Sequence, residues 1–161
     1  MESRRHQYET TTKWTGNRGR GTATYAGYER AHETQSAGRP RIDSSSDPSF
    51  RGDPGRWNPE LLLVAALSQC HMLVYLHQAA VSGVVVQEYV DTATGSMVET
   101  PDGGGHFEEV VLHPVVTVAA EEMVEAAEAL HAKSSELCFI ASSVHFPVHH
   151  EPEIRVSAPI P

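Results

Sequence analysis

The sequence predicts an α+β domain in which a β-sheet packs on one long, buried central helix. Residues 58–82 are apolar nearly all round, as expected of a helix at the centre of a protein. Segments with alternating or β-branched residues, which are typical of strands, lie on both sides of this run. The resulting order of elements, ββ-α-ββ-α-β, favours the α+β class.

The first 34 residues are expected to form a β-hairpin. Gln7–Trp14 alternates and is rich in threonine, and Thr22–Glu33 alternates again. Residues 15–21 between them are rich in glycine and indicate a turn. Residues 35–57 are dense in Pro, Gly, Ser and Asp, and we expect them to form a long loop. A long irregular stretch inside a domain is usually functional or disordered.

The central helix predicted over residues 58–82 has clear end signals. Asn58 can cap the free amides of the first turn, and Pro59 is tolerated at the first helical position. Gly83 supplies the stop.

Residues 83–161 are expected to complete the sheet and add a second helix. Pro114 places one of the strands at an edge or a bulge. In chain order we expect a strand at Val84–Thr94, a hairpin turn at Asp102–Gly105, a strand at His106–Val118, an amphipathic helix at Glu121–His131 whose apolar stripe continues to Cys138, and a last strand at Val144–Val156. The length predicts a single domain, 1–161.

The composition argues against some classes of function. The formal charge of −9 argues against nucleic acids and anionic membrane surfaces as partners. No apolar run follows the first residues, so we expect no signal peptide. Residues 61–86 are mostly apolar but include several polar residues, and we predict that this segment is too polar to span a membrane. These features predict a soluble cytoplasmic protein, where two cysteines are more often catalytic or inert than structural.

Cys70 and Cys138 are the two cysteines of the chain. The helical neighbours of Cys70 are apolar, which by itself favours an inert, packed thiol. A reactive Cys70 needs a cation, and Arg18 on the glycine-rich turn can supply one. Glu60 can orient that arginine, although it also suits the first turn of a helix as a partner of the helix dipole.

Three segments resemble the OsmC/Ohr family, the osmotically inducible and organic hydroperoxide resistance proteins. Trp57–Leu63 with Ala66–Cys70 looks like the central-helix motif of the family. Trp14–Gly19 resembles its arginine turn, with Arg20 as a competitor of Arg18, and Cys138 falls where the family keeps its second cysteine. The order of elements fits over essentially the whole chain.

The resemblance implies a cysteine-based peroxidase that reduces organic hydroperoxides and needs no cofactor or metal. Cys70 is then the peroxidatic thiolate, Arg18 holds it, and Glu60 orients Arg18. Cys138 is the resolving cysteine that forms a disulfide, and an external dithiol, often of the lipoyl type, resets the enzyme. The residues after Cys138 are Phe-Ile-Ala-Ser, whereas the family often has proline followed shortly by serine, so the local geometry of the second thiol differs.

Helix geometry predicts a homodimer. Glu60 and Cys70 are ten residues apart, which is about 15 Å along one helix and about 80° around it. One arginine cannot readily hold both within one helix. We therefore expect an intertwined homodimer with two sites built from both chains, and Arg18 could come from either.

Two alternatives remain open. The ten histidines could include a metal site, but no Cys-x-x-Cys or His-Glu-x-x-His spacing is present. The same fold could instead be a non-enzymatic ligand-binding or stress-associated module whose thiols are spectators.

Overall fold

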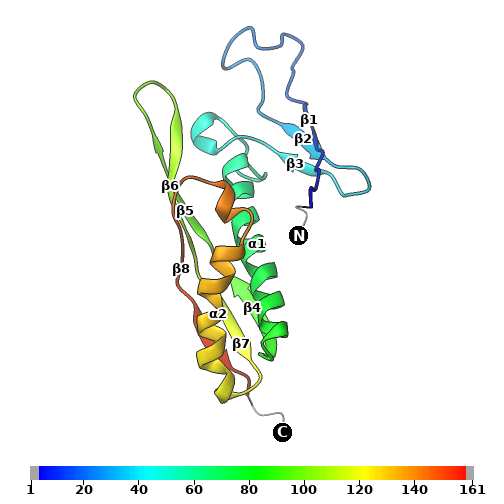
Figure 1. Ribbon diagram of the computed structural model, residues 1–161. Coiled ribbons are helices and arrows are strands. Elements are labelled where there is room, and N and C mark those ends of the chain that lie inside the picture. Colours follow the sequence, from blue (N-terminus) through cyan, green and yellow to red (C-terminus); the bar gives the residue numbers. More distant parts are fainter. Residues whose placement is uncertain (1–3, 159–161) are drawn as a thin grey trace. The chain divides into compact units, whose positions relative to one another are not determined.

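The computed structural model describes residues 4–158, and the chain divides into two compact units, residues 1–62 and 63–161 (Figure 1). The predicted single domain includes residues 1–3 and 159–161, which lie outside the described residues.

A small antiparallel sheet forms the centre of the N-terminal unit. Its strands are β1 (Thr11–Trp14), β2 (His32–Gln35) and β3 (Ile42–Ser44), in the order β1-β2-β3. A short 3-10 helix, η1 (Pro48–Phe50), follows, and the Asp47 side chain caps it by accepting from the Ser49 amide at 2.8 Å. The predicted loop 35–57 thus contains regular structure.

The strand predicted over Thr22–Glu33 is wrong for most of its length, because β2 begins only at His32. Turns fill the preceding segment. The Asn17 side chain accepts from the amides of Gly19 and Gly21 at 2.8 and 3.0 Å, and both glycines have positive φ angles of 96° and 54°. The alternating residues that we predicted to form a strand therefore lie in an irregular segment.

The central helix α1 (Pro59–Val81) forms as predicted. The Asn58 side chain accepts from the Leu61 amide at 2.8 Å, and Gly83 follows the helix with a φ of 74°. By length and composition alone α1 could also cross a membrane, as many core helices of soluble proteins could, so its polar residues do not exclude a span by themselves.

Within the single chain, the predicted burial of the central helix α1 is complete along one side only. One row of its side chains is fully buried: Leu67, His71, Tyr75 and Ala79. Leu73 and Val81 are 62% and 66% exposed. One copy of the C-terminal unit supplies two sheets and one further helix, and these cover one side of α1 only.

Two three-stranded sheets make up the C-terminal unit. One has the order β4-β7-β9 and the other β5-β6-β8. In each, the first pair of strands is antiparallel and the second is parallel. The strands are β4 (Val86–Asp91), β5 (Thr94–Glu99), β6 (Gly105–Leu112), β7 (Pro114–Val118), β8 (Val148–His150) and β9 (Glu153–Val156).

Two predicted strands are each divided in two. The run predicted as His106–Val118 breaks at His113, whose amide donates to the Asp91 side chain at 2.8 Å instead of entering a ladder. The two pieces, β6 and β7, belong to different sheets. Val144–Val156 divides in the same way, near Pro152, which has no amide to donate. The strand predicted over Val84–Thr94 corresponds to β4, and only its last residue belongs to β5. The hairpin turn predicted at Asp102–Gly105 joins β5 to β6.

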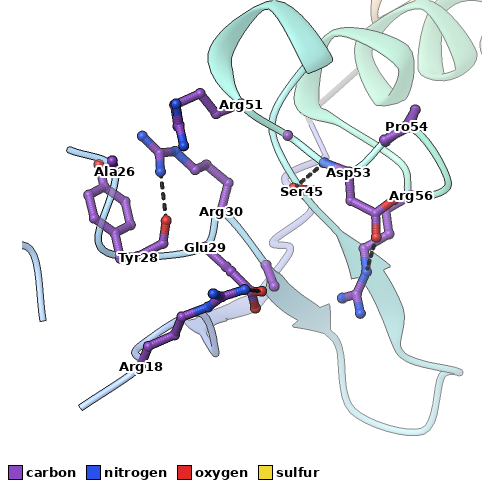
Figure 2. Close-up of a pocket in the computed structure, with 12 residues that line it drawn as sticks. Arg18, Ala26, Tyr28, Glu29, Arg30, Ser45, Arg51, Asp53, Pro54 and Arg56 are labelled. Atoms are coloured by element: carbon purple, nitrogen blue, oxygen red, sulfur yellow. Dashed lines mark hydrogen bonds and ion pairs between the residues drawn. The ribbon is translucent and has the colours of Figure 1, made fainter. Parts of the chain in front are cut away.

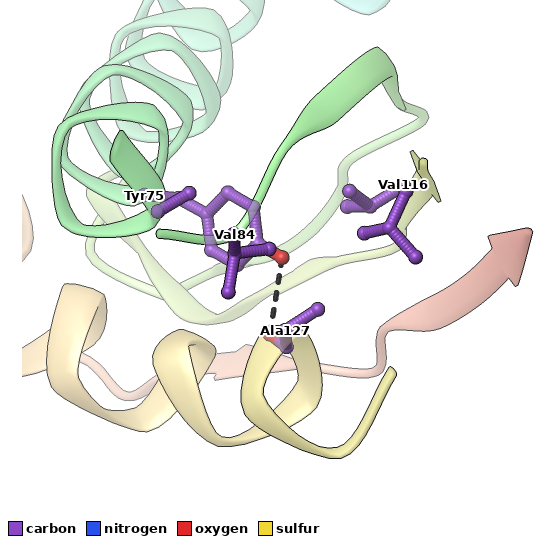
Figure 3. Packing of buried hydrophobic residues seen from close by; sticks show 6 residues of the cluster. Tyr75, Val84, Val116 and Ala127 are labelled. Atoms are coloured by element: carbon purple, nitrogen blue, oxygen red, sulfur yellow. Dashed lines mark hydrogen bonds between the residues drawn. The ribbon is translucent and has the colours of Figure 1, made fainter. Parts of the chain in front are cut away.

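The second helix, α2 (Val124–Leu137), packs with α1 and the β4-β7-β9 sheet in one core cluster (Figure 3). A 3-10 turn, η2 (Glu121–Met123), precedes it, so the regular helix starts later and ends later than predicted. The Tyr75 hydroxyl donates to the Ala127 carbonyl at 3.0 Å and ties α1 to α2. A second cluster around Leu67, Val110 and Leu112 joins α1 to β6. The α+β class predicted from the sequence is confirmed.

Candidate functional site: a cysteine pair in the C-terminal unit

The fold brings the two cysteines together across 68 residues of sequence. Cys70 lies in the middle of α1 and is half-buried, while Cys138 follows α2 directly and is 1% exposed. The Cys70 side chain lies near enough to influence the Cys138 thiol, and both are free thiols. The structure therefore places the predicted peroxidatic and resolving cysteines side by side.

Cys138 is held by the turn that follows it. The Ala141 amide points at its sulfur at 3.4 Å, and the Ser142 hydroxyl donates to its carbonyl at 2.9 Å. Of the residues that depart from the family pattern, Ala141 and Ser142 belong to a short 3-10 helix, η3 (Ala141–Ser143), and both contact Cys138. Burial, and then the adjacent Cys70 side chain, raise the pKa of the Cys138 thiol to about 11. The Cys138 thiol is therefore protonated at neutral pH.

A stack of imidazoles lies next to Cys70 in the chain and inside the core. His71 and His131 are almost completely buried, and their rings stack at 5.3 Å with a 3.0 Å hydrogen bond between Nε2 and Nδ1. His150 stacks on both rings, at 5.7 and 6.1 Å, and Tyr75 lies 4.2 Å from His131. Burial lowers the pKa of His71 to about 4 and that of His131 to about 3, so the stack is neutral at physiological pH.

The sequence did not show this stack, although its histidines were among those considered for a metal site. The available signal was His71 itself, which falls on the buried row of α1 between Leu67 and Tyr75. Within residues 4–158, no group of three or more His, Cys, Asp or Glu side chains could hold a metal ion.

Arg18 lies on the turn of the N-terminal unit, as predicted, but its partner is Glu29. The two exposed side chains form an ion pair and hydrogen bond. The competing Arg20 is also exposed. The pairing of Arg18 with Glu60 expected from the sequence is therefore not formed within this single chain.

Glu60 lies in the first turn of α1 and is half-buried. One of its carboxylate oxygens, Oε2, is buried and has no hydrogen-bond partner in the described part of the chain. A buried carboxylate oxygen without a donor is costly, so a donor from outside this set of contacts would stabilise it.

Comparison with known proteins identifies the family. The model of the OsmC-like protein family matches residues 52–153, which include α1 and both cysteines. An OsmC-like protein of unknown function from Vibrio cholerae is 31% identical, with 92% of this chain and 99% of that one covered, and a TM-score of 0.81.

Two structures of organic hydroperoxide resistance proteins share the fold. The one from Legionella pneumophila is 21% identical, with 96% and 100% of the two chains covered and a TM-score of 0.70. The one from Elizabethkingia anophelis is 16% identical, with 97% and 100% covered and a TM-score of 0.69. No curated protein matches the sequence. On the family match and the 31% identity, the chain belongs to the OsmC/Ohr family, as its sequence motifs predicted.

Proposed function

We propose that the protein is a cysteine-based peroxidase that reduces organic hydroperoxides to alcohols. The observation that carries this proposal is the placement of Cys70 beside Cys138 in one unit. A half-buried thiol next to a fully buried one has the arrangement of an attacking and a resolving cysteine.

The chemistry balances with these two sulfurs and an external dithiol. The Cys70 thiolate attacks one oxygen of the O–O bond, which breaks, and the departing alkoxide takes a proton to leave as alcohol. Cys70 is thereby oxidised to a sulfenic acid. The Cys138 thiol then attacks the Cys70 sulfur, water leaves, and a disulfide forms. A dithiol, which we propose to be of the lipoyl type, reduces this disulfide and is itself oxidised.

Two observations favour an organic hydroperoxide as the substrate. Apolar side chains of α1 precede and follow Cys70, including Ala66, Leu67 and Val74, and an apolar wall suits an organic substrate. Proteins of the same fold from Legionella pneumophila and Elizabethkingia anophelis are described as organic hydroperoxide resistance proteins. A putative one from Vibrio cholerae, 19% identical, has captopril bound in one of its active sites.

We further propose that the working form is an intertwined homodimer in which Arg18 and Glu60 complete the site around Cys70. Leu73 and Val81 leave apolar surface of α1 exposed, which a second copy of the helix would cover. The unpartnered Glu60 Oε2 would be stabilised by a hydrogen bond from a donor such as an arginine. Arg18 would have to exchange its exposed pairing with Glu29, which at such exposure contributes little stability.

The proposed setting is the cytoplasm, where thiols are kept reduced, with no nucleic-acid or membrane partner expected at a charge of −9. One observation favours the second candidate, a binding module with spectator thiols: the Arg18 side chain is engaged in an ion pair with Glu29.

One experiment separates the two functions. The purified protein is given one equivalent of tert-butyl hydroperoxide, and its intact mass and peroxide consumption are measured with dihydrolipoamide or glutathione as reductant. If the protein is a peroxidase, oxidation should lower its mass by two hydrogens, and peroxide turnover should continue with the dithiol. An unchanged mass together with no consumption would leave the binding module as the function.

A further inference from the structure

Four arginines of the N-terminal unit line one cavity of about 570 Å³, here named the arginine cavity (Figure 2). Two of the four have acidic partners in its wall: Arg18 pairs with Glu29, and Arg56 pairs with Asp53 at 3.3 Å. The other two, Arg30 and Arg51, have no carboxylate partner within residues 4–158. The cavity thus carries two uncompensated positive charges in a protein whose formal charge is −9.

Arg30 is held in place by aromatic side chains. Its guanidinium carbon lies 4.2 Å from the Tyr25 ring centre and 4.1 Å from that of Tyr28, and Nη1 donates to the Tyr28 carbonyl at 2.7 Å. Its other terminal nitrogen, Nη2, is buried and has no hydrogen-bond partner among the described residues. A charged donor that is buried and unsatisfied is costly, and an anionic acceptor would remove that cost.

Arg51 has a backbone conformation that is unfavourable for an arginine. Its φ of 66° lies in the left-handed region, where it ends the 3-10 helix η1, and glycine or asparagine adopts that conformation at lower cost. Its exposed side chain nevertheless reaches the same ring that Arg30 contacts, with its guanidinium carbon 6.0 Å from the Tyr25 centre. Strained backbone retained for one side chain is typical of functional positions.

We propose that the arginine cavity is a binding site for a small molecule that carries an oxyanion, a carboxylate or a phosphate group, held by Arg30 and Arg51. Guanidinium groups present paired donors that match either group. The cavity volume lies in the range of small-molecule sites. Neither Arg30 nor Arg51 takes part in the proposed thiol chemistry, although Arg18, which the peroxidase proposal uses, also lines the cavity.

The test is calorimetric titration of the full-length protein at fixed ionic strength with two probes, inorganic pyrophosphate and succinate. We expect saturable binding at one site per chain. Arg51→Asn should weaken it by about tenfold or more, because a charge-assisted bidentate contact is lost. The same variant should keep or raise the melting temperature, because asparagine suits the left-handed conformation. Binding loss without stability loss separates a ligand contact from a structural role.

Lys13→Gln is the matched control, because Lys13 is an exposed residue of β1 in the same unit and carries the same charge. It should change the affinity by no more than about twofold, as expected for a distant screened charge. Stronger binding of pyrophosphate identifies a phosphate ligand, and stronger binding of succinate a carboxylate. Absence of saturable binding with both probes, unchanged affinity in Arg51→Asn, or an equal loss in Lys13→Gln would overturn the proposal.

Discussion

The two units of the chain contain different kinds of candidate functional side chain. The C-terminal unit contains both cysteine thiols, an apolar core cluster and a neutral histidine stack. The N-terminal unit contains an exposed turn arginine and an arginine-lined cavity. Each unit therefore holds part of the site proposed above. A peroxidase site at Cys70 requires a nearby cation that stabilises the thiolate.

The largest expected effect is at Cys70. Cys70→Ser should abolish peroxide turnover, because the other cysteine of the chain, Cys138, is buried and cannot take over the attack on the O–O bond. A peroxide-consumption assay with excess dithiol measures this. Ser68→Ala, a change on the same helix that leaves both sulfurs in place, is the control. Turnover that survives in Cys70→Ser would contradict the assignment of the peroxidatic thiol.

Cys138→Ala should stop turnover after one equivalent of peroxide. The Cys70 sulfenic acid then lacks its resolving partner and is oxidised further to sulfinic and sulfonic acids. Mass spectrometry after stepwise addition of peroxide detects these products at Cys70. A variant that continues to cycle with a dithiol, without over-oxidation, would show that Cys138 does not resolve the intermediate.

The arginine of the N-terminal unit should have a smaller effect than either cysteine. Arg18→Gln is expected to lower kcat/KM by about 100-fold, a loss typical of removing one donor that stabilises developing charge. Arg20→Gln is the matched control and should change kcat/KM little. A large loss in Arg20→Gln and none in Arg18→Gln would reassign the role to the neighbouring arginine.

The histidine stack should make the C-terminal unit sensitive to acid. Because burial lowers the pKa of His71 to about 4 and that of His131 to about 3, the unfolded chain binds more protons than the folded one below pH 6.5. The free energy of unfolding should therefore fall as the pH drops from 6.5 towards 4, by up to about 1.4 kcal/mol per pH unit for each histidine.

Urea denaturation at several pH values measures this slope. His77→Gln, which removes an exposed histidine of the same helix, should keep the slope of the wild type. A flat profile between pH 6.5 and 5 would mean that the stacked imidazoles are charged in the folded protein.

The sequence predicted the central helix and the family well, because both depend on local signals. Asn58, Pro59 and Gly83 mark the ends of α1, and the structure places the helix within one residue of the predicted bounds. The spacing from Pro59 to Cys70 carried the family resemblance that the comparisons confirm.

Features that depend on distant partners were not predicted. The break at His113 comes from the Asp91 side chain on another strand, and periodicity within one run cannot show it. Tyr25 and Tyr28 lie in a segment predicted as a strand, yet both rings contact the Arg30 guanidinium. The stack of His71 on His131 joins α1 to α2 across 60 residues, so its members looked unrelated in the sequence.

The central claim is that each active site combines Cys70 of one chain with Glu60 of the other, and co-expression of two inactive chains tests it most directly. Glu60→Ala and Cys70→Ser chains carry different affinity tags, and heterodimers are isolated by purification on both. Shared sites predict partial return of peroxidase activity, because one site of the heterodimer then carries both lesions and the other carries none. Verified heterodimers without any recovered activity, or a fully active monomer, would contradict this account.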